Sequence, residues 1–451
     1  MGKDLRRATN LEIIKYGIGG IGVNIPFCMI IGFLMFFMTD IAGIPGAIAG
    51  LILLVINTFD AINDPVIGSI ADRTNTKWGR YRPFLIFASP LLALVCVGLF
   101  TVPDFSLNGK IAYYAVMYVM YSVGYTAMTI PFQALTPLMS EDGAQRNTIV
   151  MSRSMLGNIG FFGIYSAIIP IVAFFGNDAG AWQKAAMVFG TLTVIFMWIC
   201  ANGAKRHDMP RKVVNHEKFS IKRQLELIKK NKALIVMFSS MGLFALVTAV
   251  VSATNMYFYK YVVGDMSYMA KYGLVSLGMT IIAAPFVPKL IGKFGKKRII
   301  QTGMAAFLIS PITLLLTRPF DNSTVMLGLI ALNGLCSVLI NITTWSLIPD
   351  CVEYGEWKTG VQSAGLVSSS YTFVAKFTAA FSGLLVGSIL QMVGYVPDQV
   401  QTTEAMNGIL YVYTLVPIAG AIIAGSVMKF FPVDEASLAQ IMEENRLNRA
   451  A

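Results

Sequence analysis

Long apolar runs alternate with short polar segments along the whole chain. Twelve of these runs are long enough to predict membrane-spanning helices, because a helix needs about 20 apolar residues to cross a bilayer. Their expected ranges are 11–39, 43–70, 83–102, 111–139, 148–175, 181–203, 233–262, 266–291, 299–317, 324–349, 363–392 and 405–431. The pattern therefore predicts an all-α membrane protein.

Basic residues are unevenly distributed among the segments between these runs. The segments after the second and eighth runs are basic (Arg73, Lys77, Arg80 and Arg82; Lys289, Lys293, Lys296, Lys297 and Arg298), whereas alternate segments carry mostly single cations such as Lys110, Lys184 and Arg318. Cytoplasmic loops of membrane proteins carry the excess of Lys and Arg. Because the number of runs is even, this pattern predicts that both termini are cytoplasmic.

The longest polar segment, 204–232, divides the chain into two blocks. It carries ten Lys or Arg residues against three acids, and Ile221, Leu225 and Ile228 have helical spacing, which predicts a surface helix resting on anionic lipid headgroups. Glycine- and cation-rich sequences that begin at Gly68 and Pro288 follow the second helix of each block, as in a weak internal repeat. We therefore expect two pseudo-symmetric six-helix bundles (1–203 and 233–431), a basic cytoplasmic linker (204–232) and a cytoplasmic tail with a short amphipathic helix (432–451).

Composition agrees with a polytopic membrane protein. Of the 451 residues, 55% are hydrophobic and 13% are charged, whereas soluble domains carry about 25% charged residues. The net charge of +11 lies in the basic loops, so it does not indicate nucleic-acid binding. The five cysteines have no CxxC spacing, and the two histidines (His207 and His216) both lie in the basic linker, so no metal or haem cofactor is expected. The polar N-terminus does not resemble a signal peptide, and the absence of a nucleophile–base cluster predicts no catalytic residues and no enzyme.

Two aspartates in the second run are the most informative charges. Asp60 and Asp64, in FDAINDP, share one helix face because they are four residues apart, and Asn63 adds an amide oxygen beside them. Two adjacent carboxylates in a low-dielectric region need a proton or a cation, and oxygen ligands suit a hard cation such as Na⁺. The alternative is structural: Asp64 caps the helix before Pro65, and Asp60 pairs with a buried Lys or Arg.

Single cations interrupt two other apolar runs, Arg153 in the fifth and Lys376 in the eleventh. Because charges in the membrane are costly, these side chains are expected to face a cavity. They would either recognise a polar or anionic substrate or pair with Asp60 and Asp64, and Lys376 could exchange between the two partners. The sequence leaves both interpretations open.

Uncharged polar and aromatic residues also accumulate within the runs. Each alone is typical of an interhelical hydrogen bond, but amides, hydroxyls and rings together indicate a carbohydrate site. These residues are Asn24, Tyr125, Thr126, Thr129, Gln133, Asn255 and Trp345.

The first two runs, including FDAINDPVIGSIADRTNTKWGRYRPF, resemble those of the glycoside–pentoside–hexuronide:cation symporters of the major facilitator superfamily. YTAMTIPFQALTP, DCVEYGEWKTG and the central basic segment extend the resemblance over nearly the whole chain. It implies the major facilitator fold, a cation site at Asp60, Asn63, Asp64 and Thr126, and a sugar site at Asn24, Tyr125, Thr129, Gln133 and Arg153, with Lys376 near both. Na⁺ is the favoured coupling ion, with H⁺ or Li⁺ as alternatives.

The sequence departs from the melibiose carrier of that family. Positions 24 and 129, aspartates in that carrier, are Asn24 and Thr129 here, while Val23 and Gln133 replace a lysine and a tryptophan. Loss of two carboxylates beside Arg153 favours an anionic sugar, such as a glucuronide or hexuronide, over an α-galactoside. A xyloside or other neutral glycoside is the alternative.

We therefore expect a secondary symporter of the bacterial inner membrane that imports a glycoside with a cation by alternating access. Its expected partners are the glycoside, the cation and membrane lipids, without an obligatory protein partner. A lysolipid transporter of the same fold and a non-transporting membrane sugar sensor are the rival functions.

Overall fold

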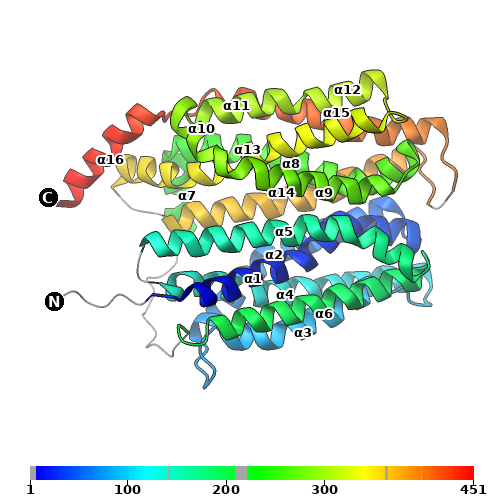
Figure 1. The fold of residues 1–451 in the computed structure, drawn as a ribbon, viewed down its shortest axis with the longest axis horizontal. Coiled ribbons are helices and arrows are strands. Elements are labelled where there is room, and N and C mark those ends of the chain that lie inside the picture. Colours follow the sequence, from blue (N-terminus) through cyan, green and yellow to red (C-terminus); the bar gives the residue numbers. More distant parts are fainter. Residues whose placement is uncertain (1–6, 141–142, 209–220, 361–363, 398, 451) are drawn as a thin grey trace. The chain divides into compact units, whose positions relative to one another are not determined.

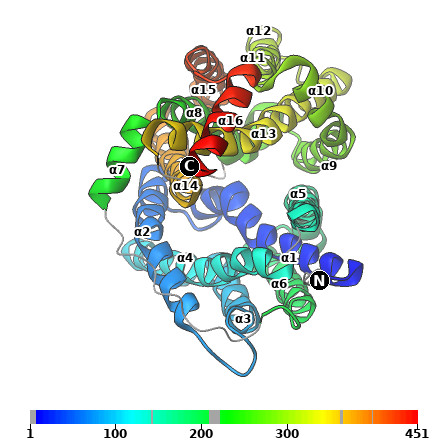
Figure 2. The ribbon, with the colours of Figure 1, turned by 90° about the vertical axis from the view of Figure 1, so that its left-hand side faces the viewer.

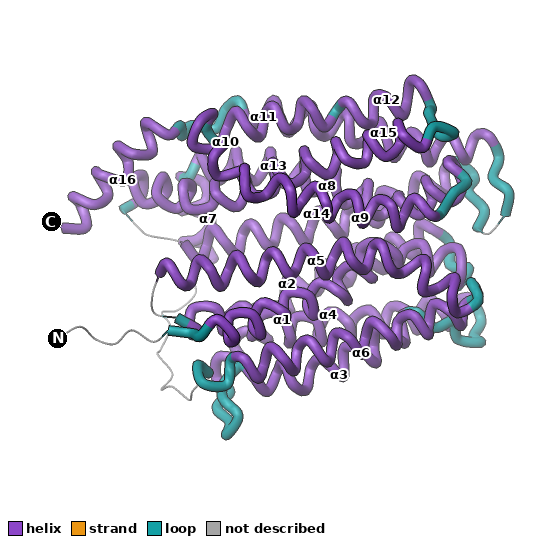
Figure 3. Tube along the Cα trace, in the orientation of Figure 1, coloured by secondary structure: helices purple, strands orange, loops and turns teal. Residues whose placement is uncertain are grey.

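The computed structural model describes residues 7–140, 143–208, 221–360, 364–397 and 399–450. The regular structure of these residues is helical, and their β-bridge between Thr76 and Gly79 is isolated (Figure 3). Nine helical segments of the described chain are long and apolar enough to cross a membrane. The prediction of an all-α membrane protein is confirmed.

Contacts divide the chain into two units. Unit 1 contains the chain up to residue 215, Gly264–Leu274 and Gly387–Thr402. Its helices are α1 (Asn10–Met29), extended by the π-helical segments Ile30–Leu34 and Phe37–Ile41, then α2 (Gly46–Arg73), α3 (Arg82–Leu99), α4 (Leu107–Met139), α5 (Gly143–Phe175) and α6 (Ala179–Gly203). Within this unit α1 packs between α5 and α6, α3 between α6 and α4, and α4 against α2 (Figures 1 and 2).

Unit 2 contains residues 216–263, Val275–Val386 and Thr403–Ala451. Its helices are α7 (Ile221–Lys230), α8 (Lys232–Tyr257) with the π-helical segment Phe258–Val263, α9 (Ser267–Ala283), the 3₁₀ turn Ala284–Phe286, α10 (Val287–Phe294), α11 (Lys296–Phe307), α12 (Ile309–Thr317), α13 (Ser323–Thr359), α14 (Ala364–Met392), α15 (Thr403–Met428) and α16 (Glu435–Ala450). The start of α9 and the end of α14 belong to unit 1. The helices expected in the linker and in the tail are observed as α7 and α16, whereas His216 lies outside the described residues.

Each of the twelve apolar runs coincides with a helix or with a helix broken into segments, but one boundary was wrong. The tenth run was expected to end at residue 349, whereas α13 continues to Thr359. Asp350 can lie inside this helix because Lys296 Nζ pairs with it at 2.6 Å and also donates to the Ser346 carbonyl oxygen at 2.9 Å. The helix ends at Gly360, whose φ of 67° suits a glycine.

Close backbone approach joins α1 to α5. A side chain at Gly20 would bring its Cβ within 2.3 Å of the Arg153 carbonyl oxygen, so only glycine fits there. Trp182 of α6 stacks on Phe100 and packs against Phe33 and Phe37, which lie in the two π-helical segments that extend α1. These contacts set where α1 and α5 present their polar residues.

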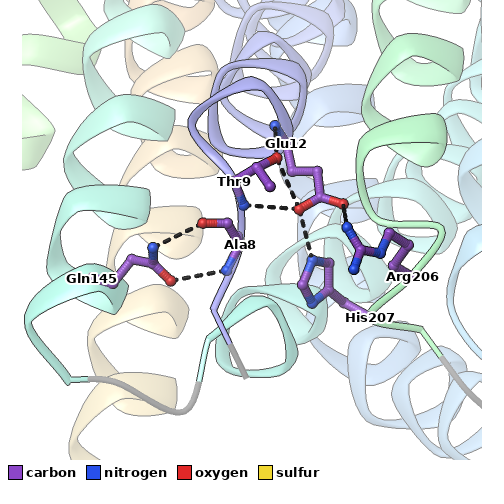
Figure 4. Close-up of polar contacts among 6 residues, drawn as sticks. All are labelled: Ala8, Thr9, Glu12, Gln145, Arg206 and His207. Carbon is purple, nitrogen blue, oxygen red and sulfur yellow. Dashed lines mark hydrogen bonds and ion pairs between the residues drawn. The ribbon is translucent and has the colours of Figure 1, made fainter. Parts of the chain in front are cut away.

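Polar contacts tie together the helix ends of unit 1 nearest the N-terminus (Figure 4). The Gln145 side-chain amide exchanges two hydrogen bonds with the backbone of Ala8, at 2.9 and 2.8 Å. Thr9 and Glu12 form a capping box at the start of α1. The Glu12 carboxylate also contacts His207 at 3.3 Å and Arg206 at 3.6 Å, both just after α6. The starts of α1 and α5 and the end of α6 are thereby joined.

The segment between α2 and α3 is fixed by a residue from far along the chain. Asp208, 3% exposed, accepts hydrogen bonds from the backbone N–H groups of Arg80, Tyr81 and Arg82 at 3.1, 2.8 and 2.8 Å. Because the first N–H groups of a helix lack internal partners, this carboxylate caps α3. The cation-rich segment therefore has a structural role here.

Candidate functional site

The two aspartates of α2 meet a polar stretch of α4. Thr126 Oγ1 lies 2.9 Å from Oδ1 of Asp60 and 2.9 Å from Oδ1 of Asp64. Ser122, one turn earlier on α4, donates its hydroxyl hydrogen to Asp60 Oδ1 at 2.6 Å. Asp60 is 7% exposed and Thr126 is 1% exposed, so two acidic side chains converge on one hydroxyl in a buried position.

Asn63 adds an amide to this group of oxygens. Its side chain is buried, and Nδ2 has no hydrogen-bond partner among the described residues. Buried polar atoms are usually bonded within a protein core. The structure brings together Asp60, Asp64 and Thr126 of the four residues predicted to hold a cation, and Asn63 lies beside them on α2. Carboxylate, hydroxyl and amide oxygens fit a hard cation.

Three tyrosines form a ladder along α4. Tyr121 stacks on Tyr118 and on Tyr125, with ring centroids 5.8 and 5.5 Å apart. They share a helix face because they are three and four residues apart, and Phe27 of α1 extends the stack from Tyr125 at 6.1 Å. The ladder runs along the part of α4 that carries Ser122 and Thr126 and reaches Phe27, which lies three residues after Asn24 on α1.

The predicted sugar residues of unit 1 differ in exposure. Tyr125 and Asn24 are half-buried, Thr129 is buried, and Gln133 is exposed. Asn24 Nδ2 donates to the Gly20 carbonyl oxygen at 2.9 Å. Its amide oxygen and its second N–H therefore suit a ligand hydroxyl.

Arg153 of α5 is anchored to α4. Nη1 donates to Thr136 Oγ1 at 3.3 Å, and the guanidinium lies 5.6 Å from the centre of the Phe132 ring. Tyr16 of α1 supports this arrangement, because its hydroxyl lies 2.6 Å from both Thr136 Oγ1 and the Phe132 carbonyl oxygen. The described contacts of Arg153 thus position its guanidinium on α4 through Thr136 and Phe132.

Three further polar candidates lie on unit 2. Lys376 is a half-buried residue of α14, and Trp345 on α13 is 56% exposed. Asn255 is fully buried and accepts a hydrogen bond from the Tyr413 hydroxyl at 2.9 Å. Asn255 therefore joins α8 to α15, which is the interhelical role that single polar residues in membrane helices usually have.

Sequence reasoning missed Ser122, whose side chain directly contacts Asp60. The available signal was its position four residues before Thr126, which places both hydroxyls on one face of α4. It also missed the tyrosine ladder, although the i, i+3, i+7 spacing of Tyr118, Tyr121 and Tyr125 was visible.

A family model described as MFS/sugar transport protein matches residues 15–435. The chain belongs to this family. It is 29% identical to the uncharacterised symporter YnaJ of Bacillus subtilis (strain 168), covering 98% of this chain and 96% of the relative. It is 30% identical to the isoprimeverose transporter of Lactiplantibacillus pentosus, covering 94% and 89%, and 28% identical to the glucuronide carrier protein homolog of Escherichia coli (strain K12), covering 96% and 94%.

Solved structures show the same fold at low sequence identity. The nucleoside transporter NupG matches with a TM-score of 0.62 and 14% identity, over 94% of this chain and 100% of that one. A structure of proton dependent oligopeptide transporters matches with a TM-score of 0.66 and 13% identity, over 93% and 98%. The resemblance to the glycoside–pentoside–hexuronide:cation symporters is thus confirmed. The chain is a multi-pass sugar transporter of the major facilitator superfamily, and its relatives are transporters rather than enzymes.

Proposed function

We propose that this transporter imports an anionic glycoside, of the glucuronide or hexuronide class, together with Na⁺. The observation that carries the proposal is the convergence of Asp60 and Asp64 on the hydroxyl of Thr126. We place the protein in the bacterial inner membrane with both termini cytoplasmic, because the Lys- and Arg-rich segments follow the positive-inside pattern.

The acidic pair explains why a cation is needed. Two carboxylates that face one hydroxyl repel each other, and burial in a membrane protein strengthens that repulsion. A cation between them removes the repulsion and gains oxygen ligands from both helices. Na⁺ would thereby draw α2 and α4 together, whereas H⁺ would neutralise one carboxylate without bridging the helices. H⁺ and Li⁺ are the alternative coupling ions.

Charge favours an anionic sugar. Arg153 contributes positive charge, while Asn24 and Thr129 contribute none. An arginine binds a carboxylate through two parallel N–H bonds, and the contact with Thr136 orients the Arg153 fork in advance. Tyr125 supplies a ring for the apolar face of the sugar. The names of two relatives, a glucuronide carrier homologue and an isoprimeverose transporter, support a sugar substrate in both charge classes.

The tyrosine ladder of α4 couples Na⁺ binding to sugar binding. Na⁺ that orders α2 against α4 also orders Tyr125, which stacks on Phe27 near Asn24. Each ligand then raises the affinity for the other, by a free energy of typically about 1–3 kcal/mol. Alternating access releases both ligands on the cytoplasmic side.

The test is Na⁺-driven glycoside accumulation in proteoliposomes. Asp64→Asn keeps the side-chain size but removes one charge, so accumulation is expected to fall by at least about tenfold. Asp265→Asn is the matched control, because Asp265 precedes α9 and its side chain is 47% exposed. Full accumulation by Asp64→Asn would refute the cation site, and uptake of lysolipid instead of glycoside would favour the rival transporter.

A further inference from the structure

We propose that Ser122 determines the cation specificity of this site by supplying an additional oxygen that a metal ion requires and a proton does not. The inference rests on the proposed function, since it concerns the same pair of aspartates. It adds a residue that neither the sequence motif nor the predicted cation set includes.

Ser122 directly contacts Asp60, one member of the acidic pair. Its hydroxyl lies 2.6 Å from Asp60 Oδ1, and the same oxygen also accepts from Thr126 at 2.9 Å. Ser122 is 5% exposed and Asp60 is 7% exposed. Two hydroxyls from consecutive turns of α4 therefore meet one carboxylate oxygen of α2.

This orientation differs from that of two other buried hydroxyls in unit 1, those of Ser89 and Thr193. A serine or threonine inside a helix usually donates to the carbonyl oxygen four residues earlier. Ser89 does so to Leu85 at 2.6 Å, and Thr193 does so to Phe189 at 3.0 Å. Ser122 and Thr126 instead turn toward α2, so their hydroxyls serve the aspartates rather than their own helix.

Metal cations and protons differ in the number of oxygen ligands that they need. A serine hydroxyl has one hydrogen and two lone pairs, so it can donate to Asp60 and still offer a lone pair to a cation. Hard metal cations take several oxygen ligands at once, whereas a proton needs one carboxylate oxygen. Loss of the Ser122 oxygen should thus weaken Na⁺ and Li⁺ binding and spare H⁺.

Other titratable groups near the contact between Ser122 and Asp60 also influence which ion binds. Among the contacts described for this site, the titratable side chains include Asp60 and Asp64 from α2, the phenols of Tyr118, Tyr121 and Tyr125 from α4, and the buried thiol of Cys96 from α3. The conservative substitutions at Ser122 leave all of them in place. A change in ion preference would then report on the Ser122 oxygen itself.

The experiment measures glycoside uptake by proteoliposomes against Na⁺, Li⁺ or H⁺ gradients. For Ser122→Ala we expect the Na⁺ concentration for half-maximal uptake to rise about tenfold, the effect of losing one bond to a charged group, while H⁺-driven uptake stays within about twofold. Ser122→Thr retains the oxygen and should restore the Na⁺ response. Ser122→Cys keeps the shape of the side chain, but its soft sulfur is a poor ligand for Na⁺. The Na⁺ concentration for half-maximal uptake should therefore rise in this variant as well, which keeps the test valid if Ser122→Ala folds poorly.

Ser89→Ala is the matched control, since it removes a buried hydroxyl that bonds only its own helix in the described structure. Equal losses of Na⁺- and H⁺-driven uptake, an unchanged Na⁺ requirement, or a wild-type protein driven by H⁺ alone would each overturn the role of Ser122. The first two results would leave the proposed Na⁺ site intact, whereas transport driven by H⁺ alone would also refute Na⁺ coupling. The proposed cation site fails separately if no cation stimulates uptake by the wild-type protein.

Discussion

Arg153 combines a positive charge with a fixed orientation, because Thr136 holds one guanidinium nitrogen and the Phe132 ring lies beneath it. Arg153→Lys preserves the charge but removes the planar fork that pairs with a carboxylate. We expect glucuronide affinity to fall about tenfold and neutral xyloside affinity to change by less than about twofold. Competition binding with the two sugars measures this difference.

The control for that variant is Arg206→Lys, whose side chain is 75% exposed at the end of unit 1 that carries the N-terminus. An equal loss of affinity for both sugars would show that Arg153 acts through its packing on Phe132. An unchanged glucuronide affinity would show that another residue binds the anion.

Individual site residues were predictable where spacing along one helix decides the geometry. Asp60, Asn63 and Asp64 occupy adjacent positions on α2, so their proximity follows from the helix repeat. Ser122 was not identified, because the direction of a serine hydroxyl depends on whether its own carbonyl or a neighbouring helix offers the better acceptor. The structural role of Asn255 could not be predicted from local spacing either, because its partner Tyr413 lies 158 positions away in the sequence.

Among the helices, the start of α3 depends on a single carboxylate. Asp208→Ala would leave three backbone N–H groups without their acceptor, each of which costs about 1–3 kcal/mol when buried and unsatisfied. We expect the melting temperature of the purified protein to fall by about 5 °C or more. Asp178→Ala is the comparison, because Asp178 caps α6 through one N–H, that of Ala181.

Equal melting temperatures for those two variants would contradict the capping role of Asp208. The sequence did not reveal this role, because Asp208 follows Arg82 by 126 positions and is surrounded by basic residues. The end of α13 was missed for a similar reason. The hydrophobic pattern stops near Asp350, and the ion pair with Lys296 that keeps this carboxylate inside the helix arises only from tertiary structure.

For the whole molecule, the alternation of apolar and polar segments was sufficient to predict the helices and the fold class, since lipid tolerates helices with satisfied backbones. It did not predict which segments pack together. Gly264–Leu274 and Gly387–Thr402 were expected in the C-terminal bundle, yet they pack with unit 1, where the Tyr395 hydroxyl donates to Asp40 at 2.5 Å. Contacts between segments far apart in the chain leave no periodic pattern of residues from which they could be predicted.

For the transporter as a whole, we predict that Na⁺ and sugar bind cooperatively. The direct measurement is thermal stabilisation of the purified protein by an aryl β-glucuronide in NaCl and in choline chloride. A ligand that binds the native state raises its melting temperature, and coupling requires each ligand to strengthen the other. We predict a larger sugar-induced shift in NaCl than in choline chloride. Equal shifts in the two salts would contradict cation coupling, and a shift with lysolipid but with no sugar would contradict the proposed substrate class.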